Sequence, residues 1–235
     1  MRLMERDLEV LRAVHAHRVL RADQIHRLLF PSRNTANARL QRLFHHRFLD
    51  RRWRPVEYGQ GMGQAFYLLG RRGAQLLAQR SGMEPSPAMG RKAIRTLRSP
   101  FIEHTCTVND VRIAFSLGVQ GAGCTLERWL REDELKSAQA GAHGDAALTR
   151  FGGATIIPDA CFTLKRGARQ ARFLLEVDRA TESNGRWAQR VRNYLSYLAR
   201  ERLASYPRVL IVTTSAARLE HLKGATENAG GRAQF

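Results

Sequence analysis

Residues 150–200 constrain the fold most strongly, because they bring three carboxylates to the ends of two apolar strands. One strand is expected to end at Ile156-Ile157-Pro158-Asp159, and the next reads Phe173-Leu174-Leu175-Glu176-Val177-Asp178. A tight turn through 165–169 is predicted to join them. Carboxylates this close repel one another unless a cation or another basic group offsets their charge. The sequence therefore predicts a strand pair whose polar end carries either a function or a compensating ionic network.

The composition indicates a nucleic-acid partner. The 235 residues include 39 Lys plus Arg against 21 Asp plus Glu, a formal net charge of +18. A folded chain with this surplus attracts polyanions, of which nucleic acid is the leading candidate. Arginine greatly outnumbers lysine, which suits bidentate contacts with phosphate and guanine, although a GC-rich genome would produce the same bias. Hydrophobic residues make up 43%, which is enough for folded cores.

The cysteines and the hydropathy predict the compartment. Cys106, Cys124 and Cys161 have no metal-type spacing, and their odd number fits a reducing cytosol better than a disulfide framework. No apolar run reaches the length of a membrane span, and the N-terminus lacks the order of a signal peptide. We therefore expect a cytoplasmic protein that has no membrane partner.

The first eighty residues have the pattern of a winged helix-turn-helix. Apolar spacing predicts three short helices that end near residue 48, with a stop at Pro31 before the third. Three short helices with a tight turn before the third are typical of a helix-turn-helix. Strands at 49–54 and 65–69, joined by a glycine-rich turn at 59–63, predict a hairpin that would form the wing. A further helix is expected to open at Gly70.

The basic and amide side chains of the third helix and the hairpin are the candidate DNA-binding residues, because Arg and Asn read the edges of G and A in the major groove. The third helix supplies Arg33, Asn34, Asn37, Arg39 and Arg42. The hairpin supplies Arg51, Arg52 and Arg54, which we expect to contact phosphates. A solvated helix face would explain any single arginine, but helix and hairpin together favour double-stranded DNA as the partner.

A linker is predicted at 81–95, where turn formers are frequent and periodicity is lost. It would separate a domain at 1–80 from a second domain at 96–235. The second domain is predicted to run helix, three strands, helix, strand and helix, with a mobile loop at 137–153. Its strand at 208–214 is apolar, as is typical of a sheet buried on both faces. This order indicates a restriction-endonuclease-like α/β domain, so the fold class is α+β or α/β.

The two carboxylate strands resemble those of PD-(D/E)xK nucleases, which hold a magnesium ion between a Pro-Asp strand and a Glu-x-Lys strand. The resemblance implies that Asp159 and Glu176 bind the metal and that Glu103 supplies a further carboxylate. In such a site the lysine orients water or stabilises developing charge, but Asp178 takes its place here. Arg190 is the candidate substitute, although arginine stays protonated and is a poor acid or base.

Two interpretations of this cluster are open. The first is a magnesium-dependent endonuclease site made of Glu103, Asp159, Glu176, Asp178 and Arg190. The second, which we favour, is a structural network without a cofactor, in which Asp159, Glu176, Asp178 and Arg179 pair with Arg112 or Arg190. In that case the second domain is nuclease-like but does not cleave.

The chain resembles the replication-relaxation family of plasmids and integrative elements, whose members join an N-terminal winged helix to a nuclease-like half. The resemblance rests on the segment 103–112, on Ile157-Pro158-Asp159-Ala160, and on 176–182 followed by Trp187 and Tyr194. It implies binding to origin-region DNA in replication or conjugative mobilisation, with a relaxase or a replication protein as a candidate partner.

The predicted function is thus a sequence-directed double-stranded DNA-binding protein that acts at a replication or conjugative-transfer origin or as a local regulator. Two other classes are a magnesium-dependent endonuclease or nickase, and a transcriptional repressor that dimerises through its second domain. A homodimer would suit palindromic sites. The last residues, 230–235, read as the middle of a fold, so we expect a further strand.

Overall fold

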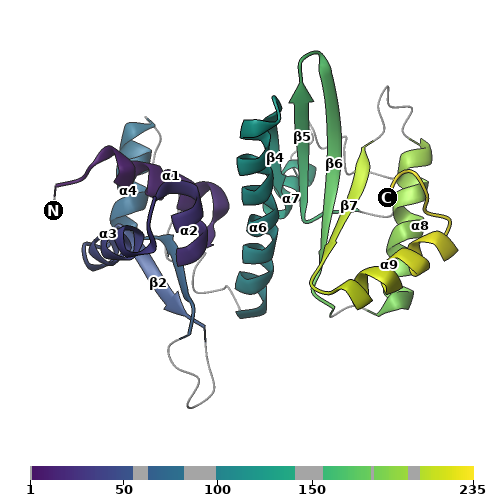
Figure 1. Ribbon diagram of the computed structural model, residues 1–235, viewed down its shortest axis with the longest axis horizontal. Coiled ribbons are helices and arrows are strands. Elements are labelled where there is room, and N and C mark those ends of the chain that lie inside the picture. The colour runs from purple at the N-terminus through teal and green to yellow at the C-terminus, as the bar shows by residue number, and fades with distance from the viewer. Residues whose placement is uncertain (1, 55–62, 82–98, 141–155, 181–182, 201–206) are drawn as a thin grey trace. The chain divides into compact units, whose positions relative to one another are not determined.

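The computed structural model describes residues 2–54, 63–81, 99–140, 156–180, 183–200 and 207–235. It is a mixed α+β chain that divides into two compact units, 1–114 and 115–235 (Figure 1). The division falls within helix α6 (Ser99–Gly121). The predicted linker, apart from Ser81, and the predicted hairpin turn, apart from Gly63, lie outside the described residues. Within the described ranges, no helix is long and apolar enough to cross a membrane.

The first unit consists of helices around a small antiparallel sheet with the strand order β1-β3-β2. Its elements are α1 (Glu5–His17), β1 (Val19–Arg21), α2 (Ala22–Leu29), α3 (Arg33–His45), β2 (Leu49–Trp53), β3 (Ala65–Leu69) and α4 (Arg71–Arg80). The helices and the two hairpin strands agree with the apolar spacing of the sequence. The short strand β1 was not predicted, because it is defined by its pairing with β3, where Leu20 lies opposite Tyr67.

The core of the first unit forms because apolar spacing turns one face of α1 and one face of α3 inward. Leu11 and Leu40 are fully buried, and every position of β3 is buried. Gly73 lets α4 approach this core closely, since a Cβ atom there would lie 2.3 Å from the carbonyl oxygen of Phe48. Glycine at this position therefore sets how near α4 can come to the end of α3 and the start of β2.

The first part of α6 belongs to the first unit. Ile102 and Cys106 pack in an apolar cluster with Val19 of β1. The side-chain amide of Asn109 donates to the carbonyl oxygens of His17 at 3.1 Å and Val19 at 2.7 Å. These bonds satisfy buried backbone acceptors where α1 gives way to β1, so α6 completes the core of this unit.

A buried ion pair joins α1 to α3. The carboxylate of Asp7 is fully buried, and the guanidinium of Arg39 donates to both of its oxygens. Asp7 also accepts a hydrogen bond from the Met4 N–H at 2.7 Å, which closes the first turn of α1. Buried charges require partners, so this pair fixes α3 against α1. The structure thus holds Arg39, a predicted groove-reading residue, within the unit, where its side chain is only 13% exposed.

We predict that Arg39→Ala destabilises the protein by roughly 3–5 kcal/mol, because it leaves the Asp7 carboxylate buried without its partner. Asp7→Asn combined with Arg39→Ala should restore part of that loss, since no uncompensated charge then stays buried. Urea unfolding followed by circular dichroism measures both variants. Equal losses in the single and double variants would contradict the role of the pair.

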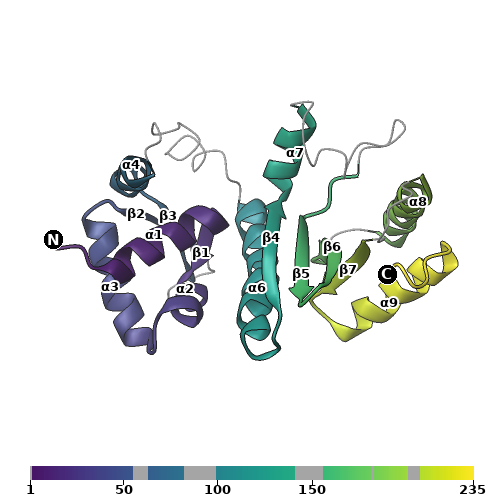
Figure 2. The same ribbon diagram turned by 90° about the horizontal axis from the view of Figure 1, so that it is seen from above.

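The second unit is built on a four-stranded mixed sheet with the order β4-β5-β6-β7. Its elements are β4 (Thr125–Arg131), α7 (Glu132–Ala140), β5 (Ala160–Arg166), β6 (Arg169–Asp178), α8 (Asn184–Arg200), β7 (Arg208–Thr213) and α9 (Ala216–Asn228). The pairs are antiparallel except for β6 and β7, which are parallel. Helices α8 and α9 lie on the same side of this sheet (Figure 2). The predicted tight turn is confirmed and contains Gly167 at φ 58°.

Alternation along the strands gives this sheet two different faces. Leu174 and Val209 point toward α8, where they pack with Tyr194 in the main apolar cluster. Phe162 points to the opposite face and stacks on Trp129 with ring centroids 4.8 Å apart. Both faces are therefore covered by apolar side chains along the middle of the sheet.

The structure differs from the predicted strand at the Pro-Asp motif and from the predicted loop. The strand begins at Ala160, after the motif, because Pro158 has no N–H to donate to a ladder. Helix α7 covers 132–140, although a loop was expected from 137; the part of that loop at 141–153 lies outside the described residues. The three acidic residues at the start of α7 suit a helix N-terminus, because they interact favourably with the helix dipole. They could have indicated this helix from the sequence.

Strand β7 also differs from its prediction. Its apolar sequence is typical of a strand buried on both faces, yet it forms an edge of the sheet, and positions 210–213 are only partly buried. The C-terminal segment takes the place of a neighbouring strand at one point, where the Val209 N–H donates to the carbonyl oxygen of Gln234 at 2.7 Å. Apolar β sequence therefore indicated a strand correctly but not its position in the sheet.

Candidate nucleic-acid interface and acidic cluster

Helix α3 presents a polar and basic surface to solvent. Ser32 caps the helix by accepting a hydrogen bond from the Thr35 N–H at 3.2 Å. Burial of Ala36, Leu40 and Leu43 turns the opposite side of the helix outward. The predicted residues on that side are exposed, and they are Arg33, Asn34, Asn37 and Arg42. Of the five predicted residues on α3, these four can meet a ligand, whereas Arg39 is occupied by Asp7.

The three predicted hairpin arginines have different surroundings. The guanidinium of Arg51 lies over the rings of Phe44, 4.3 Å from the centroid, and Trp53, 4.9 Å from the centroid. Arg52 is half-buried. Arg54 forms an ion pair with α6 at 3.2 Å, but its side chain is still 55% exposed. Of these three charges, that of Arg54 is the most open to solvent, and Arg51 is committed to aromatic contacts.

The first unit carries most of the positive charge of the chain. Residues 1–114 contain 21 Lys and Arg against 9 Asp and Glu, so they hold +12 of the net +18. Helix α3 itself has no acidic residue. A field of this sign over the exposed side of α3 attracts a polyanion and raises its rate of association.

The acidic cluster of the second unit is arranged by the alternation of β6. Glu176 and Asp178 lie on the same face of the sheet because they are two residues apart, and their exposed fractions are 3% and 8%. Each meets an arginine from a helix that covers this face: Arg190 of α8 for Glu176, and Arg218 of α9 for Asp178. The structure thus brings the predicted Glu176, Asp178 and Arg190 together, but each carboxylate already has a cation.

Burial strongly perturbs Glu176. One carboxylate oxygen lies 2.5 Å from a terminal nitrogen of Arg190, and the other accepts a hydrogen bond from the Tyr194 hydroxyl. Burial raises the pKa of Glu176 from 4.5 to about 7; the charge of Arg190 opposes this rise, and the charge of Asp159 adds to it. Burial and the neighbouring Glu176 also raise the pKa of Tyr194 well above its usual value. Glu176 is therefore a buried group that exchanges its proton near neutral pH.

Asp178 has the opposite environment. Arg218 donates to its two oxygens through Nε at 2.8 Å and Nη2 at 3.0 Å. The Ala180 N–H and the Thr213 hydroxyl donate to it as well. These bonds, led by that of Arg218, lower the pKa of Asp178 and keep it ionised, against the effect of its burial. The position where a nuclease of the expected type has lysine thus holds a structural carboxylate.

Arg218 was not among the predicted site residues. It stands in the first turn of α9, three residues after the N-cap Ser215. A cation in the first turn opposes the helix dipole, and the carboxylate of Asp178 offsets this effect for Arg218. Tyr194, one of the residues that carry the family resemblance, is buried and donates a hydrogen bond to Glu176.

The other predicted members of the cluster have separate roles. The Asp159 carboxylate accepts a hydrogen bond from the Val177 N–H at 2.7 Å, beside the start of β5. Glu103 belongs to the first unit, where it pairs with Arg54. Arg112 also belongs to the first unit and donates to the Ala16 carbonyl oxygen at 2.9 Å.

The described side chains do not fit the expected magnesium site. Magnesium takes about six oxygen ligands, but of the two expected ligands, Asp159 and Glu176, both oxygens of Glu176 already bond Arg190 and Tyr194. Across the described ranges, no three His, Cys, Asp or Glu side chains gather into a group that could hold a metal ion. The pair of Glu176 with Arg190 is one that the predicted network contains, whereas Arg112, the other predicted partner, bonds Ala16 in the first unit.

We predict that Glu176→Gln changes the pH dependence of stability. With a pKa of about 7, folded Glu176 keeps a proton that the unfolded chain releases near pH 4.5, so its contribution to stability falls as the pH rises through this window. Glutamine does not titrate, so the variant does not lose this contribution. Between pH 4.5 and pH 7 its free energy of unfolding should rise by up to about 3 kcal/mol relative to that of the native protein. Urea unfolding at a series of pH values measures this.

Glu220→Gln is the control for that experiment, because Glu220 is an exposed carboxylate on α9. The free energy of unfolding of Glu220→Gln should differ from that of the native protein by nearly the same amount at every pH. A constant difference for Glu176→Gln as well would contradict the raised pKa.

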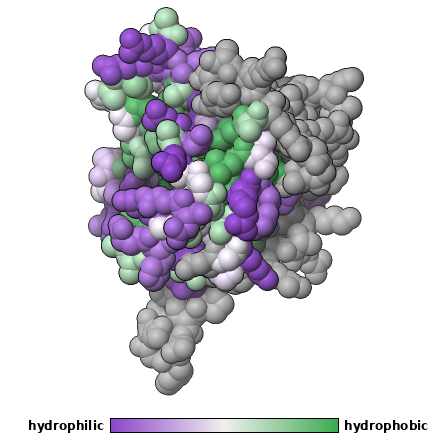
Figure 3. Space-filling view, turned by 90° about the vertical axis from the view of Figure 1, so that its right-hand side faces the viewer, coloured by the Kyte–Doolittle hydropathy of each residue, from purple (hydrophilic) through white to green (hydrophobic). Residues whose placement is uncertain are grey.

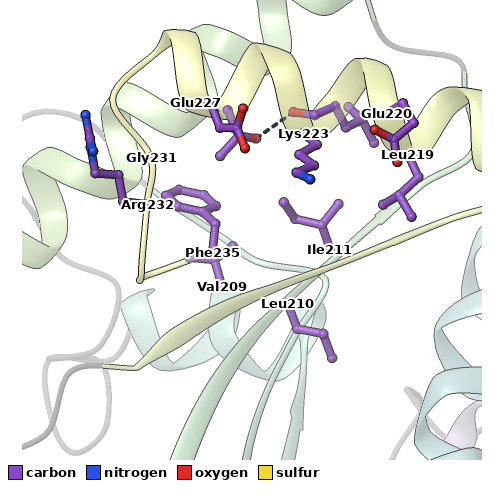
Figure 4. A pocket seen from close by; sticks show the side chains of 12 residues that line it. Val209, Leu210, Ile211, Leu219, Glu220, Lys223, Glu227, Gly231, Arg232 and Phe235 are labelled. Carbon is purple, nitrogen blue, oxygen red and sulfur yellow. Dashed lines mark hydrogen bonds between the residues drawn. The ribbon is translucent and has the colours of Figure 1, made fainter.

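A groove lies between β7 and α9 within the second unit. Figure 4 shows that Ile211, Lys223 and Phe235 point into it from the strand, the helix and the C-terminal segment. Leu219 borders it and is 46% exposed. Figure 3 views this side of the molecule, where an apolar area lies among hydrophilic side chains. The groove contains none of the predicted site residues, and its mixed lining indicates no particular ligand.

Comparison with known proteins supports the resemblance of the sequence motifs. The family model described as Replication-relaxation matches residues 11–209, a span that begins in α1 and ends in β7. Searches of the curated proteins and of the solved structures find no match. Because the family model covers well over half of the sequence, the chain belongs to the Replication-relaxation family, and this membership suggests a role in plasmid replication.

Proposed function

We propose that this protein binds double-stranded DNA through its first unit, at a plasmid replication or conjugative-transfer origin. The observation that carries the proposal is the exposed side of α3, where Arg33, Asn34, Asn37 and Arg42 lie. Arginine and asparagine match the groups that G and A present in the major groove. Family membership supports plasmid replication as the setting.

On this proposal the first unit is a winged helix-turn-helix. Only residues 30–32 separate α2 from α3, as in a helix-turn-helix whose second helix reads the groove. The β2–β3 hairpin follows α3 directly and would be the wing, with Arg52 and Arg54 contacting phosphates. The cap of Ser32 and the pair of Asp7 with Arg39 hold α3 in place. A helix fixed before binding loses less entropy when it docks.

We predict that Arg42→Ala weakens binding to random-sequence duplex DNA and lowers the slope of log affinity against log salt by about 0.9, because one phosphate contact is lost. Asn37→Ala should instead relax the preference at one base pair, by about 1–3 kcal/mol. Fluorescence anisotropy across a salt series measures the first effect, and selection from a random duplex library measures the second.

Arg166→Ala is the matched control, since Arg166 is an exposed arginine at the β5–β6 turn of the second unit. It should leave both the salt slope and the selected sequence unchanged. If Arg42→Ala and Asn37→Ala behave like this control, α3 is not the interface.

We also propose that the second unit is a restriction-endonuclease-like domain that no longer cleaves DNA and serves as a scaffold. The support is chemical: both oxygens of Glu176, one of the two carboxylates expected to bind magnesium, already bond Arg190 and Tyr194. The predicted partners of such a scaffold are a relaxase, a replication protein or a second copy of the chain. A role as a transcriptional repressor also stays a prediction.

The competing functional class is a magnesium-dependent endonuclease or nickase. The closeness of Asp159 to Glu176, whose pKa is raised to about 7, favours it.

A plasmid assay separates these two classes. We predict that supercoiled plasmid incubated with the protein in magnesium or in manganese shifts on a gel without being nicked. Asp159→Ala should behave like the native protein, because no metal-bound oxygen is lost. Metal-dependent nicking that disappears in Asp159→Ala would overturn the scaffold and make the second unit an endonuclease.

A further inference from the structure

An exposed tryptophan stands beside the basic side of α3. Trp53, the last residue of β2, is 43% exposed. The other two tryptophans of the chain are placed differently: Trp187 is 1% exposed, and Trp129 stacks on Phe162. Tryptophan is enriched at interfaces, where its large ring gains contact area, and Trp53 stands between Arg52 and Arg54 in the chain.

The indole is held in place by an arginine. The guanidinium of Arg51 lies between the rings of Phe44 and Trp53, 4.3 Å and 4.9 Å from their centroids. The Nε atom of Arg51 is buried, and no acceptor bonds it within the described part of the chain. Arg51 therefore acts through ring stacking rather than hydrogen bonding, and its planar cation orders Trp53 against α3.

The stack of Phe44, Arg51 and Trp53 adjoins the residues that are proposed to bind DNA. Residues 49, 51 and 53 share one face of β2, because alternate residues of a strand do. Phe44 belongs to α3, so the stack links the hairpin to the helix that carries the exposed Arg42 and Asn37. Arg52 and Arg54, on either side of the indole in the chain, add positive charge that would hold a phosphate backbone nearby.

We propose that Trp53, ordered by Arg51 and Phe44, is a stacking platform for an unpaired nucleobase. Within a duplex both faces of each base are covered by its neighbours, so only an unpaired or flipped base offers a free face. An indole stacks on such a face whatever the base, since every base has a π surface. The inference rests on the proposed DNA binding and makes the preferred ligand a duplex that carries an unpaired segment.

Binding of two labelled DNAs tests this ligand. One is a blunt duplex, and the other is the same duplex with a short single-stranded overhang. The native protein should bind the overhang DNA roughly tenfold more tightly, the effect expected of one stacked base. Trp53→Ala should lose this preference and keep its affinity for the blunt duplex, whereas Trp53→Phe should keep most of the preference. Trp129→Phe is the control and should match the native protein.

Intrinsic fluorescence gives a second readout, which decides the question even if Trp53→Ala fails to fold. Overhang DNA should quench tryptophan emission of the native protein more than blunt duplex does, and this difference should vanish in Trp53→Phe. Equal affinity of the native protein for both DNAs, with equal quenching, would overturn the platform while leaving duplex binding intact. No binding of either DNA would instead overturn the proposed function itself.

Discussion

Both units depend on a buried carboxylate that is neutralised by an arginine from a different helix or strand. Asp7 meets Arg39 within the first unit, and Asp178 meets Arg218 within the second. Each pair joins elements that are distant in the sequence, and neither charge could stay buried without its partner. Part of the large arginine surplus is therefore structural. The exposed Arg33 and Arg42 of α3 contribute to the positive field that attracts a polyanion.

The alternation of β6 explains why the acidic cluster resembles a metal site in the sequence but not in the structure. Glu176 and Asp178 share one face, and α8 and α9 cover that face, so an arginine of each helix lies against one of the two carboxylates. Burial outweighs the charge of Arg190 at Glu176 and leaves that group titrating near neutral pH.

Hydrophobic periodicity predicted most helices and strands, because apolar spacing is a local property of the chain. It missed β1, which exists through its pairing with β3, and it did not show that β7 lies at the edge of the described sheet. Among the predicted DNA-binding residues, Arg39 and Arg42 looked equivalent in the sequence. Only the position of Asp7 in the fold, 32 residues before Arg39, separates a structural arginine from an exposed one.

The sequence by itself determined the mixed α+β character, the basic field, the polar residues along α3 and the motifs of the family. These follow from local spacing and from charge, which need no knowledge of the fold. Only the tertiary structure decided which charges are neutralised, that Arg218 meets Asp178, and that Trp53 stays exposed beside Arg51. Ion pairing, burial and ring stacking depend on distances in space, and residues far apart in the chain set those distances.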